Sequence, residues 1–189
     1  MKFFKVSVSW LVAFILCGNL LSCAQKNSDT PGNANDINNS WKIPDHSEYS
    51  IQYPLDWELN QCGMAGTRFL ILSDMDSEND DFRENLNLIT EPATMDLDAH
   101  IEAVNHLLPQ VFTNYQKISL EKIRDGSGEH YEMISIFDME TPHTRVKNRQ
   151  HFWIANEKAY TLTWSSTLDR FDDYRETGEK ILKSFRIKQ

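Results

Sequence analysis

Apolar and polar residues alternate along much of this chain, in the short runs that are typical of β-strands. Tyr49-Ser50-Ile51-Gln52-Tyr53 alternates until Pro54 stops it, and Asn85-Leu86-Asn87-Leu88-Ile89-Thr90 alternates and ends at Pro92. Asp125-Gly126-Ser127-Gly128 predicts a hairpin between two such runs, because glycine supplies the positive φ that the turn needs. A second hairpin is expected around Asn156-Glu157. We expect strands over residues 49–53, 57–59, 68–72, 85–90, 118–123, 131–137, 146–154 and 159–164.

Two segments change to the three- or four-residue spacing of amphipathic helices. The first stripe consists of Leu97, Ile101, Val104, Leu108 and Phe112, and the second of Phe171, Tyr174, Gly178, Ile181 and Phe185. Asp96 and Asp98 lie where a helix start favours negative charge, and Pro109 is expected to end or kink the first helix. Because Gly178 lies on the second stripe, we expect close packing of this helix against a strand.

These patterns predict an α+β fold, with an antiparallel sheet of about six to eight strands sandwiched by α-helices. The 189 residues suit one compact domain once a leader is removed. We expect a signal peptide over residues 1–22, a flexible tether over 23–40 and a single domain over 41–189. The tether prediction follows from residues 25–40, which are rich in Asn, Ser, Asp and Gly and nearly free of large apolar groups.

The amino-terminal segment has the parts of a secretory signal: Lys2 and Lys5, then an apolar core over residues 6–16. This run is too short for a bilayer-spanning helix. Leu20-Leu21-Ser22-Cys23 resembles the lipobox of bacterial lipoproteins, which implies acylation of Cys23 and attachment to a membrane through acyl chains. The alternatives are an uncut anchor and a plain secretory signal. The resemblance implies a location in the bacterial cell envelope, and Ala24 favours the outer membrane if the cell is Gram-negative.

The net charge limits the kinds of ligand that the protein can bind, and the cysteine content limits the disulfides that it can form. The formal net charge is −9 and becomes −11 when the leader takes away Lys2 and Lys5, which argues against nucleic-acid binding. With Cys17 discarded and Cys23 acylated, Cys62 stands alone, and the mature domain cannot form an internal disulfide. Cys62 is either a redox or nucleophilic thiol or a small packed side chain.

Three motifs occur in the order seen in a known family. Tyr49-Ser50-Ile51-Gln52-Tyr53-Pro54 with Asp56-Trp57 is similar to the opening block of PsbP-like proteins. Phe82-Arg83-Glu84-Asn85-Leu86-Asn87-Leu88 is similar to its next strand, and Lys180-Ile181-Leu182-Lys183-Ser184-Phe185 to its closing helix. The family includes extrinsic photosystem subunits, a nuclear-import factor and many bacterial lipoproteins. The resemblance therefore implies the same fold and a docking or accessory role more than any particular reaction.

One expected strand concentrates positive charge on a single face. Arg145, Lys147, Arg149, His151 and Trp153 occupy alternate positions, so their side chains point the same way. In an acidic protein such a patch is a candidate contact for an acidic ligand or protein. The alternative is a solvated face, or ion pairs with Glu132 or Asp138 on the neighbouring strand.

The sequence supports metal binding and catalysis less strongly than it supports docking. The loop of residues 74–81 has oxygen ligands at alternate positions, Asp74, Asp76, Glu78 and Asp80, but Asn79 and Asn85 stand where a calcium loop needs Gly and Glu. Asp98, Glu102 and His106 at i+4 spacing are explained by pairing along a helix. The sequence thus predicts no metal and no cofactor. We interpret residues 74–81 as a solvated acidic loop.

Catalytic motifs are absent from the sequence: there is no Gly-x-Ser-x-Gly elbow, His-Glu-x-x-His, phosphate loop or dinucleotide fingerprint. We therefore expect a lipid-anchored accessory or binding protein of the cell envelope without catalytic activity, which docks a protein or a small ligand. The alternatives are a calcium- or metal-binding envelope protein and a hydrolase with a site assembled from scattered residues.

Overall fold

The computed structural model describes residues 41–44, 46–61, 63, 66–77, 80–141 and 143–188. The predicted signal peptide, the tether and the acylated Cys23 lie outside these residues, as do Cys62 and Glu78. In the described part of the chain, no helix has the length and apolar character needed to cross a membrane.

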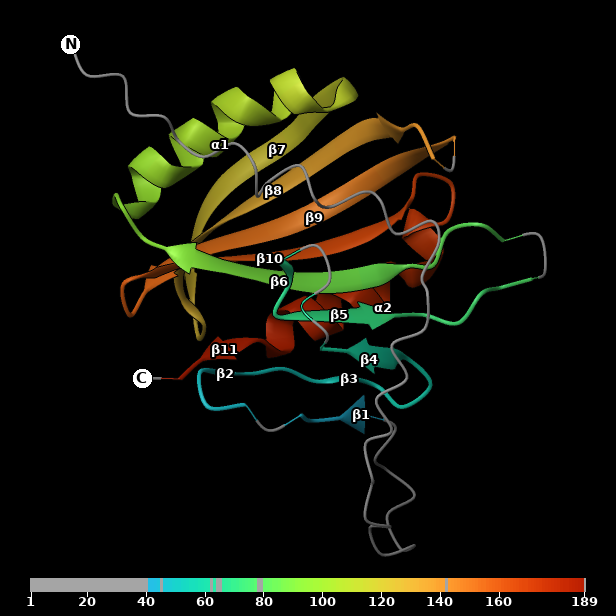
Figure 1. Cartoon of the computed structure of the whole chain (residues 1–189), viewed down its shortest axis with the longest axis horizontal. Helices are drawn as coiled ribbons and strands as arrows, with labels where there is room; N and C mark the ends of the chain where they lie inside the picture. Colours follow the sequence, from blue (N-terminus) through green and yellow to red (C-terminus); the bar gives the residue numbers. More distant parts are fainter. Residues whose placement is uncertain are drawn as a thin grey trace, which may run out of the picture.

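Seven antiparallel strands form the main sheet of the described residues, as the alternating patterns predict. Its order is β4-β5-β6-β10-β9-β8-β7 (Figure 1). The two predicted hairpins join β7 to β8 and β9 to β10. The strands are β4 (Glu58–Asn60), β5 (Phe69–Leu72), β6 (Asn85–Pro92), β7 (Thr113–Asp125), β8 (Gly128–Met139), β9 (Thr144–Ala155) and β10 (Lys158–Thr167).

Helix α2 (Phe171–Ser184) packs on one face of the sheet and closes the larger core. Trp164 of β10 lies beneath it, and a Cβ added to Gly178 would come within 2.3 Å of the Trp164 ring. The close packing expected at Gly178 is therefore confirmed. The same core contains Leu86 and Leu88 of β6 and Trp153 of β9, which places these side chains on the α2 face.

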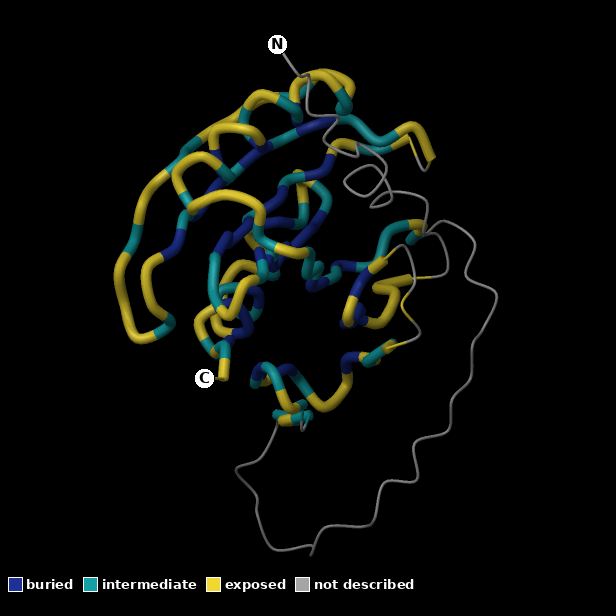
Figure 2. The backbone as a smooth tube through the Cα atoms, turned by 60° about the vertical axis from the view of Figure 1, so that its left-hand side comes forward, coloured by how far each residue is buried: buried dark blue, intermediate teal, exposed yellow. Residues whose placement is uncertain are grey.

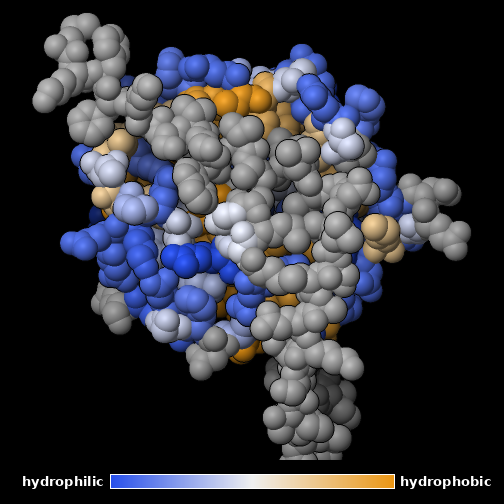
Figure 3. Space-filling view, in the orientation of Figure 1, coloured by the Kyte–Doolittle hydropathy of each residue, from blue (hydrophilic) through white to orange (hydrophobic). Residues whose placement is uncertain are grey.

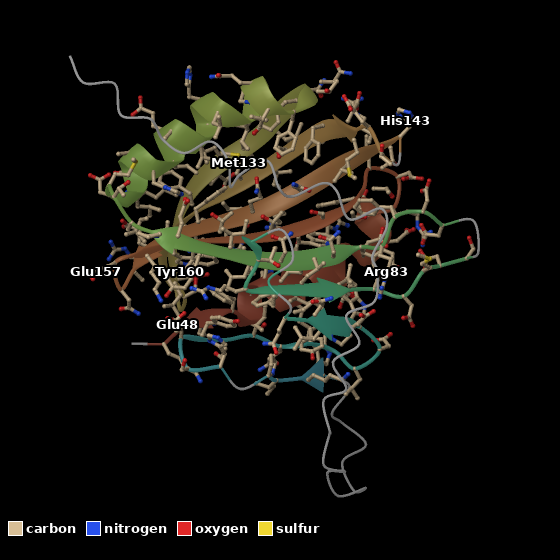
Figure 4. The ribbon with its side chains drawn as sticks, viewed as in Figure 1. Glu48, Arg83, Met133, His143, Glu157 and Tyr160 are labelled. Carbon is tan, nitrogen blue, oxygen red and sulfur yellow. The ribbon has the colours of Figure 1, made fainter. Side chains whose placement is uncertain are left out.

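Helix α1 (Leu97–Val111) packs on the opposite face, so the predicted sandwich of helix, sheet and helix is confirmed. The chain leaves β6 in the middle of the sheet and re-enters it at the far edge in β7, which is why α1 crosses the face over β7–β9 (Figure 1). Met133 of β8 lies beneath the helix (Figure 4) and joins Phe152 of β9 in the smaller core. Hydrophobic residues are visible beside α1 in Figure 3, whereas much of the remaining coloured surface is hydrophilic.

The start of α1 agrees with the sequence prediction, but Pro109 does not end the helix. Asp96 is the N-cap, and its Oδ1 accepts a hydrogen bond of 2.9 Å from the backbone N–H of Ala99. Pro109 removes one backbone donor, yet the N–H of Phe112 donates to the carbonyl of Leu108 at 3.1 Å. This bond closes the last turn, and the helix continues to Val111.

The strand expected over residues 49–53 is divided in two. β2 (Tyr49–Ser50) pairs with β11 (Arg186–Ile187), and β3 (Tyr53–Pro54) pairs with β1 (Trp41–Lys42). Between them the N–H of Gln52 donates to the Ser184 hydroxyl at 2.8 Å, and that hydroxyl also contacts the Gln52 carbonyl. The end of α2 thus binds the backbone that a continuous strand would have used.

Figure 2 shows buried residues concentrated within the strands and exposed ones at many of the turns.

Candidate functional site

The predicted positive patch lies on the part of the α2 face formed by β8 and β9. The register pairs Trp164 with Arg149, Leu162 with His151 and Tyr160 with Trp153 across β10 and β9. Because Trp164, Leu162 and Tyr160 belong to the α2 core, the patch residues share their face, as the alternation predicts. We call the side chains of Ile134, Ile136, Arg145, Lys147 and Arg149 the β8–β9 face.

Burial along the patch increases from one end to the other. Arg145 is exposed and Lys147 and Arg149 are half-buried, whereas His151 and Trp153 are buried. Trp153 is a core residue, with its ring 5.2 Å from that of Phe185. The five residues share a face, but only the Arg145 end is available to a partner.

Glu132 of β8 organises the middle of the patch. Its carboxylate accepts two hydrogen bonds from Arg149, from Nε at 2.9 Å and from Nη2 at 3.1 Å, the bidentate geometry that guanidinium groups favour. His151 Nε2 lies 2.9 Å from the same carboxylate. Arg149 Nη1 also donates to Glu179 of α2 at 2.5 Å. This network ties β8, β9 and α2 together, and it is the ion-pair alternative that the sequence left open at Glu132.

Protonation in this network follows from burial and hydrogen bonding. Burial raises the pKa of Glu132, but the hydrogen bonds from His151 and Arg149 and the charge of Arg149 outweigh it and lower the pKa to about 2. Burial lowers the pKa of His151, although Glu132 acts in the opposite direction. At neutral pH we therefore assign an ionised Glu132 and a neutral His151 that donates its Nε2–H to Glu132.

The hairpin beside this network brings a serine, a histidine and an aspartate together. Ser127 Oγ lies 2.7 Å from Asp125 Oδ1 and donates its proton there, because an ionised carboxylate only accepts. The distance from Ser127 Oγ to His130 Nδ1 is 3.5 Å. The hydroxyl proton therefore points away from the histidine, and this arrangement does not activate the serine as a nucleophile. His130 instead stacks on Trp153, with ring centroids 5.0 Å apart.

Arg145 and Lys147 are the cations of the patch that lie nearest to solvent. Arg145 Nε is 3.5 Å from Asp138 Oδ1, so the second ion pair considered from the sequence is also present. Lys147 Nζ lies 3.9 Å from the centre of the Phe171 ring. The half-buried Ile134 and Ile136 lie beside them on β8. Two cations beside two aliphatic side chains can contact a partner surface that is both acidic and apolar.

Two carboxylates of the acidic loop, Asp76 and Asp80, bind protein groups. Asp76 binds Arg170 at 2.7 Å and accepts a hydrogen bond from the Tyr174 hydroxyl at 2.8 Å, which attaches the loop to α2. Asp80 accepts bonds from the backbone N–H groups of Asp76 and Phe82. Asp74 is exposed. Within the residues that the structure describes, no group of three His, Cys, Asp or Glu could hold a metal ion.

On α1, the stripe of Asp98, Glu102 and His106 is exposed. Asp98 accepts from Lys122 at 2.7 Å and from the Tyr131 hydroxyl at 2.9 Å. These bonds fix α1 to β7 and β8.

Sequence reasoning found Glu132 as a partner of the patch but missed Glu179 and His130. Glu179 is on α2, 30 residues from Arg149, and nothing in the local pattern relates the two. His130 had a signal that could have been used, since it shares the alternation of Glu132 on β8 and faces the same side.

Solved structures resemble this fold at low sequence identity. Cyanobacterial PsbP (CyanoP) from Synechocystis matches with a TM-score of 0.57 and 15% identity over 85% of this chain and 99% of that protein. LpqN, described as involved in cell envelope biogenesis of Mycobacterium tuberculosis, matches with a TM-score of 0.55 and 12% identity over 79% and 91%. A Pseudomonas aeruginosa protein of unknown function matches with a TM-score of 0.54 and 7% identity over 77% and 96%. This chain therefore has the PsbP-like fold.

No protein-family model matches the sequence, and no curated protein matches it at the significance required.

Proposed function

We propose that this chain is a lipid-anchored accessory protein of the bacterial cell envelope, which docks a partner protein through the β8–β9 face and catalyses no reaction. Cys23, in its lipobox-like setting, would carry the acyl chains. The likeness to the envelope protein LpqN fits this location at the level of fold.

The observation that carries the docking role is that two cations near solvent, Arg145 and Lys147, extend from a rigid part of the sheet. Arg145 and Lys147 extend from a strand whose next inward residue, Arg149, is held on two sides by Glu132 and Glu179. The face is therefore already ordered before a partner binds, which reduces the entropy lost on association. In a chain of net charge −9, such cations attract an acidic partner while the rest of the surface repels it.

The test of docking is a double charge reversal, Arg145→Glu with Lys147→Glu, in the full-length protein expressed in cells. Crosslinking followed by mass spectrometry should recover a specific partner with the wild type and lose it with the double variant. Arg175→Glu is the matched control, because it reverses a charge at an exposed position of α2. Arg149 must stay unchanged, since its loss would break the network and confuse docking with folding. An identical set of crosslinked proteins for wild type and double variant would overturn the docking role.

The anchor is tested separately by Cys23→Ala. The wild type is expected in the membrane fraction with the added mass of acyl chains, and the variant is expected in the soluble fraction without it. Equal mass and equal membrane association in the two proteins would contradict the anchor while leaving the docking test intact.

A further inference from the structure

Three isoleucines at the β7–β8 edge of the sheet lie outside both cores. Ile134 and Ile136 of β8 are half-buried, and Ile118 of β7 is 56% exposed beside the register shift next to Ile134. Neither core found among the described residues includes any of the three. Apolar side chains that gather outside the core are typical of surfaces that bind another protein.

We infer that the partner of the β8–β9 face binds it with an amphipathic α-helix that has one acidic edge. This inference rests on the proposed docking role of the face, and it adds the kind of element that the face receives.

The width of the sheet leaves room for one helix beside α2. Helix α2 packs over β10, where Gly178 meets the Trp164 ring, and α1 packs on the opposite face. In the sheet order β8 is two strands from β10, which is about 9.6 Å at the usual strand spacing. Packed helices lie about 8–10 Å apart. A helix that lies along β8 can therefore contact the side of α2 without overlapping it.

The spacing of the isoleucines suits a helix. Ile134 and Ile136 are two residues apart on one strand, so their side chains point the same way and lie about 6.8 Å apart. Four residues of a helix advance by about 6 Å. Apolar residues at positions i and i+4 of a partner helix can therefore contact both isoleucines at once.

Two cations on one side of the isoleucines determine the charge of the partner. The register places Lys147 opposite Ile136, and Arg145 opposite Asp138, one step further along the strands. Arg145 and Lys147 are also two residues apart, so carboxylates one turn apart on one edge of the helix can reach both. A basic edge would be repelled here.

The other side of the isoleucines carries no charge. On β7, Gln116 pairs with Ile136 and Ser119 pairs with Ile134. A helix on this face therefore needs acidic residues along one edge only, which gives it a single favoured orientation across the sheet.

An extended segment added to the edge of β7 is the alternative mode of docking. The register of β7 against β8 shifts between Lys117 and Ser119, and such an irregularity interrupts the ladder that an added strand would follow. The face is therefore better suited to a helix than the edge is to a strand.

The experiment places the photoreactive amino acid p-benzoylphenylalanine at position 136 of the full-length protein in cells. Mass spectrometry of the crosslinked peptides should identify one partner segment with apolar residues at i and i+4 spacing and Asp or Glu along one edge. The crosslink should disappear when Arg145→Glu and Lys147→Glu are added. The same photoreactive group at position 106 is the control, because His106 is exposed on α1, on the opposite side of the sheet.

The captured segment is then synthesised as a peptide, and its binding to the full-length protein in detergent is measured by calorimetry. The peptide should gain helical circular dichroism when it binds, and its affinity should fall at high salt. Ile134→Thr with Ile136→Thr should weaken binding at least tenfold at an unchanged melting temperature, because threonine keeps the branched shape that suits a strand. Ile43→Thr removes an isoleucine that is 65% exposed elsewhere and should bind as the wild type does.

Three results would each overturn the helix while leaving the docking role intact. Position 136 captures no segment although the charge-reversal test recovers a partner, the captured segment is extended or lacks an acidic edge, or the double threonine variant binds as tightly as the wild type. If the charge reversal leaves the crosslinked proteins unchanged, the docking role and the helix fail together.

Discussion

At the scale of single residues, Glu132 decides how the positive patch behaves. It holds Arg149 and His151 in fixed geometry and leaves Arg145 and Lys147 as the cations that a partner can meet. Breaking one member of a buried ion pair is costly, because the other charge is left without a partner. Glu132 therefore stabilises the fold. The proposed docking residues, Arg145 and Lys147, lie further along β9.

Glu132→Gln should make stability less dependent on pH. The Glu132 pKa of about 2 lies below its ordinary value of 4.5, so its contribution is complete above pH 4.5 and is lost as the pH falls toward 2. The shift corresponds to roughly 3 kcal/mol. In urea unfolding, we expect the variant to be about 3 kcal/mol less stable at pH 7, with the difference shrinking below pH 4.5. Glu176→Gln removes an exposed charge from α2 and should change little. A difference that stays constant from pH 7 to pH 3 would contradict this role.

His151 adds a second contribution in a higher pH range. Its pKa is lowered by burial, so the neutral form stabilises the fold above the ordinary value of 6.5, and this stability is lost as the pH falls below it. Wild-type stability should therefore begin to fall near pH 6.5. His151→Gln retains an Nε2–H donor for Glu132 without a titrating ring, and urea unfolding of this variant should show a smaller decline between pH 7 and pH 5.

Gly178→Ala tests the contact between α2 and the sheet. Alanine would gain about 1 kcal/mol of helix propensity, but its Cβ would lie 2.3 Å from the Trp164 ring and force the helix away. We expect a net loss of roughly 1–3 kcal/mol and a lower melting temperature in calorimetry. Glu176→Ala, two residues away and exposed, should leave the melting temperature nearly unchanged or raise it. Equal behaviour of the two variants would mean that α2 does not pack as closely as described.

At the scale of elements, α1 depends on its first turn more than on its proline. Asp96 satisfies the N–H of Ala99, whereas Pro109 lies one turn from the end and its missing donor does not interrupt the last bond, from Phe112 to Leu108. Proline is therefore tolerated inside a helix that local propensity would have ended there.

Asp96→Ala should cost about 1 kcal/mol, because it leaves an orphan donor at the start of α1. Asp96→Asn keeps an acceptor oxygen and should retain most of the stability. Hydrogen exchange of the Ala99 and His100 amides, compared with global unfolding in urea, will show whether the loss starts at this end. Unchanged exchange in Asp96→Ala would contradict the cap.

At the scale of the whole molecule, one sheet separates two cores. The α2 side carries the larger core and the β8–β9 face, and the α1 side carries the smaller core. Both cores are built from residues 41–188, which is the part that the alternating and helical patterns define.

We therefore predict that a protein beginning at residue 41 folds on its own. Its thermal unfolding should be cooperative, with the melting temperature of the full-length chain, because every core residue that the structure describes is retained. A melting temperature several degrees lower would show that residues 1–40 contribute to the packing. The comparison also tests the predicted boundary between tether and domain.

The sequence alone determined the elements and their faces, because period-2 and period-3.6 patterns record which side of each element is buried. It located both hairpins, α2 and most of α1, and it showed that residues 145–153 share a face. Three features depended on contacts between distant segments: the division of residues 49–54, the continuation of α1 past Pro109 and the ion pair from Arg149 to Glu179. The alignment of Asn85 with Ser165 and of Asn87 with Thr163 also belongs to the tertiary structure, since only the strand order brings β6 beside β10. The local pattern determines which side of its own element a residue lies on. Which residue of another element it contacts is determined only when the elements pack together.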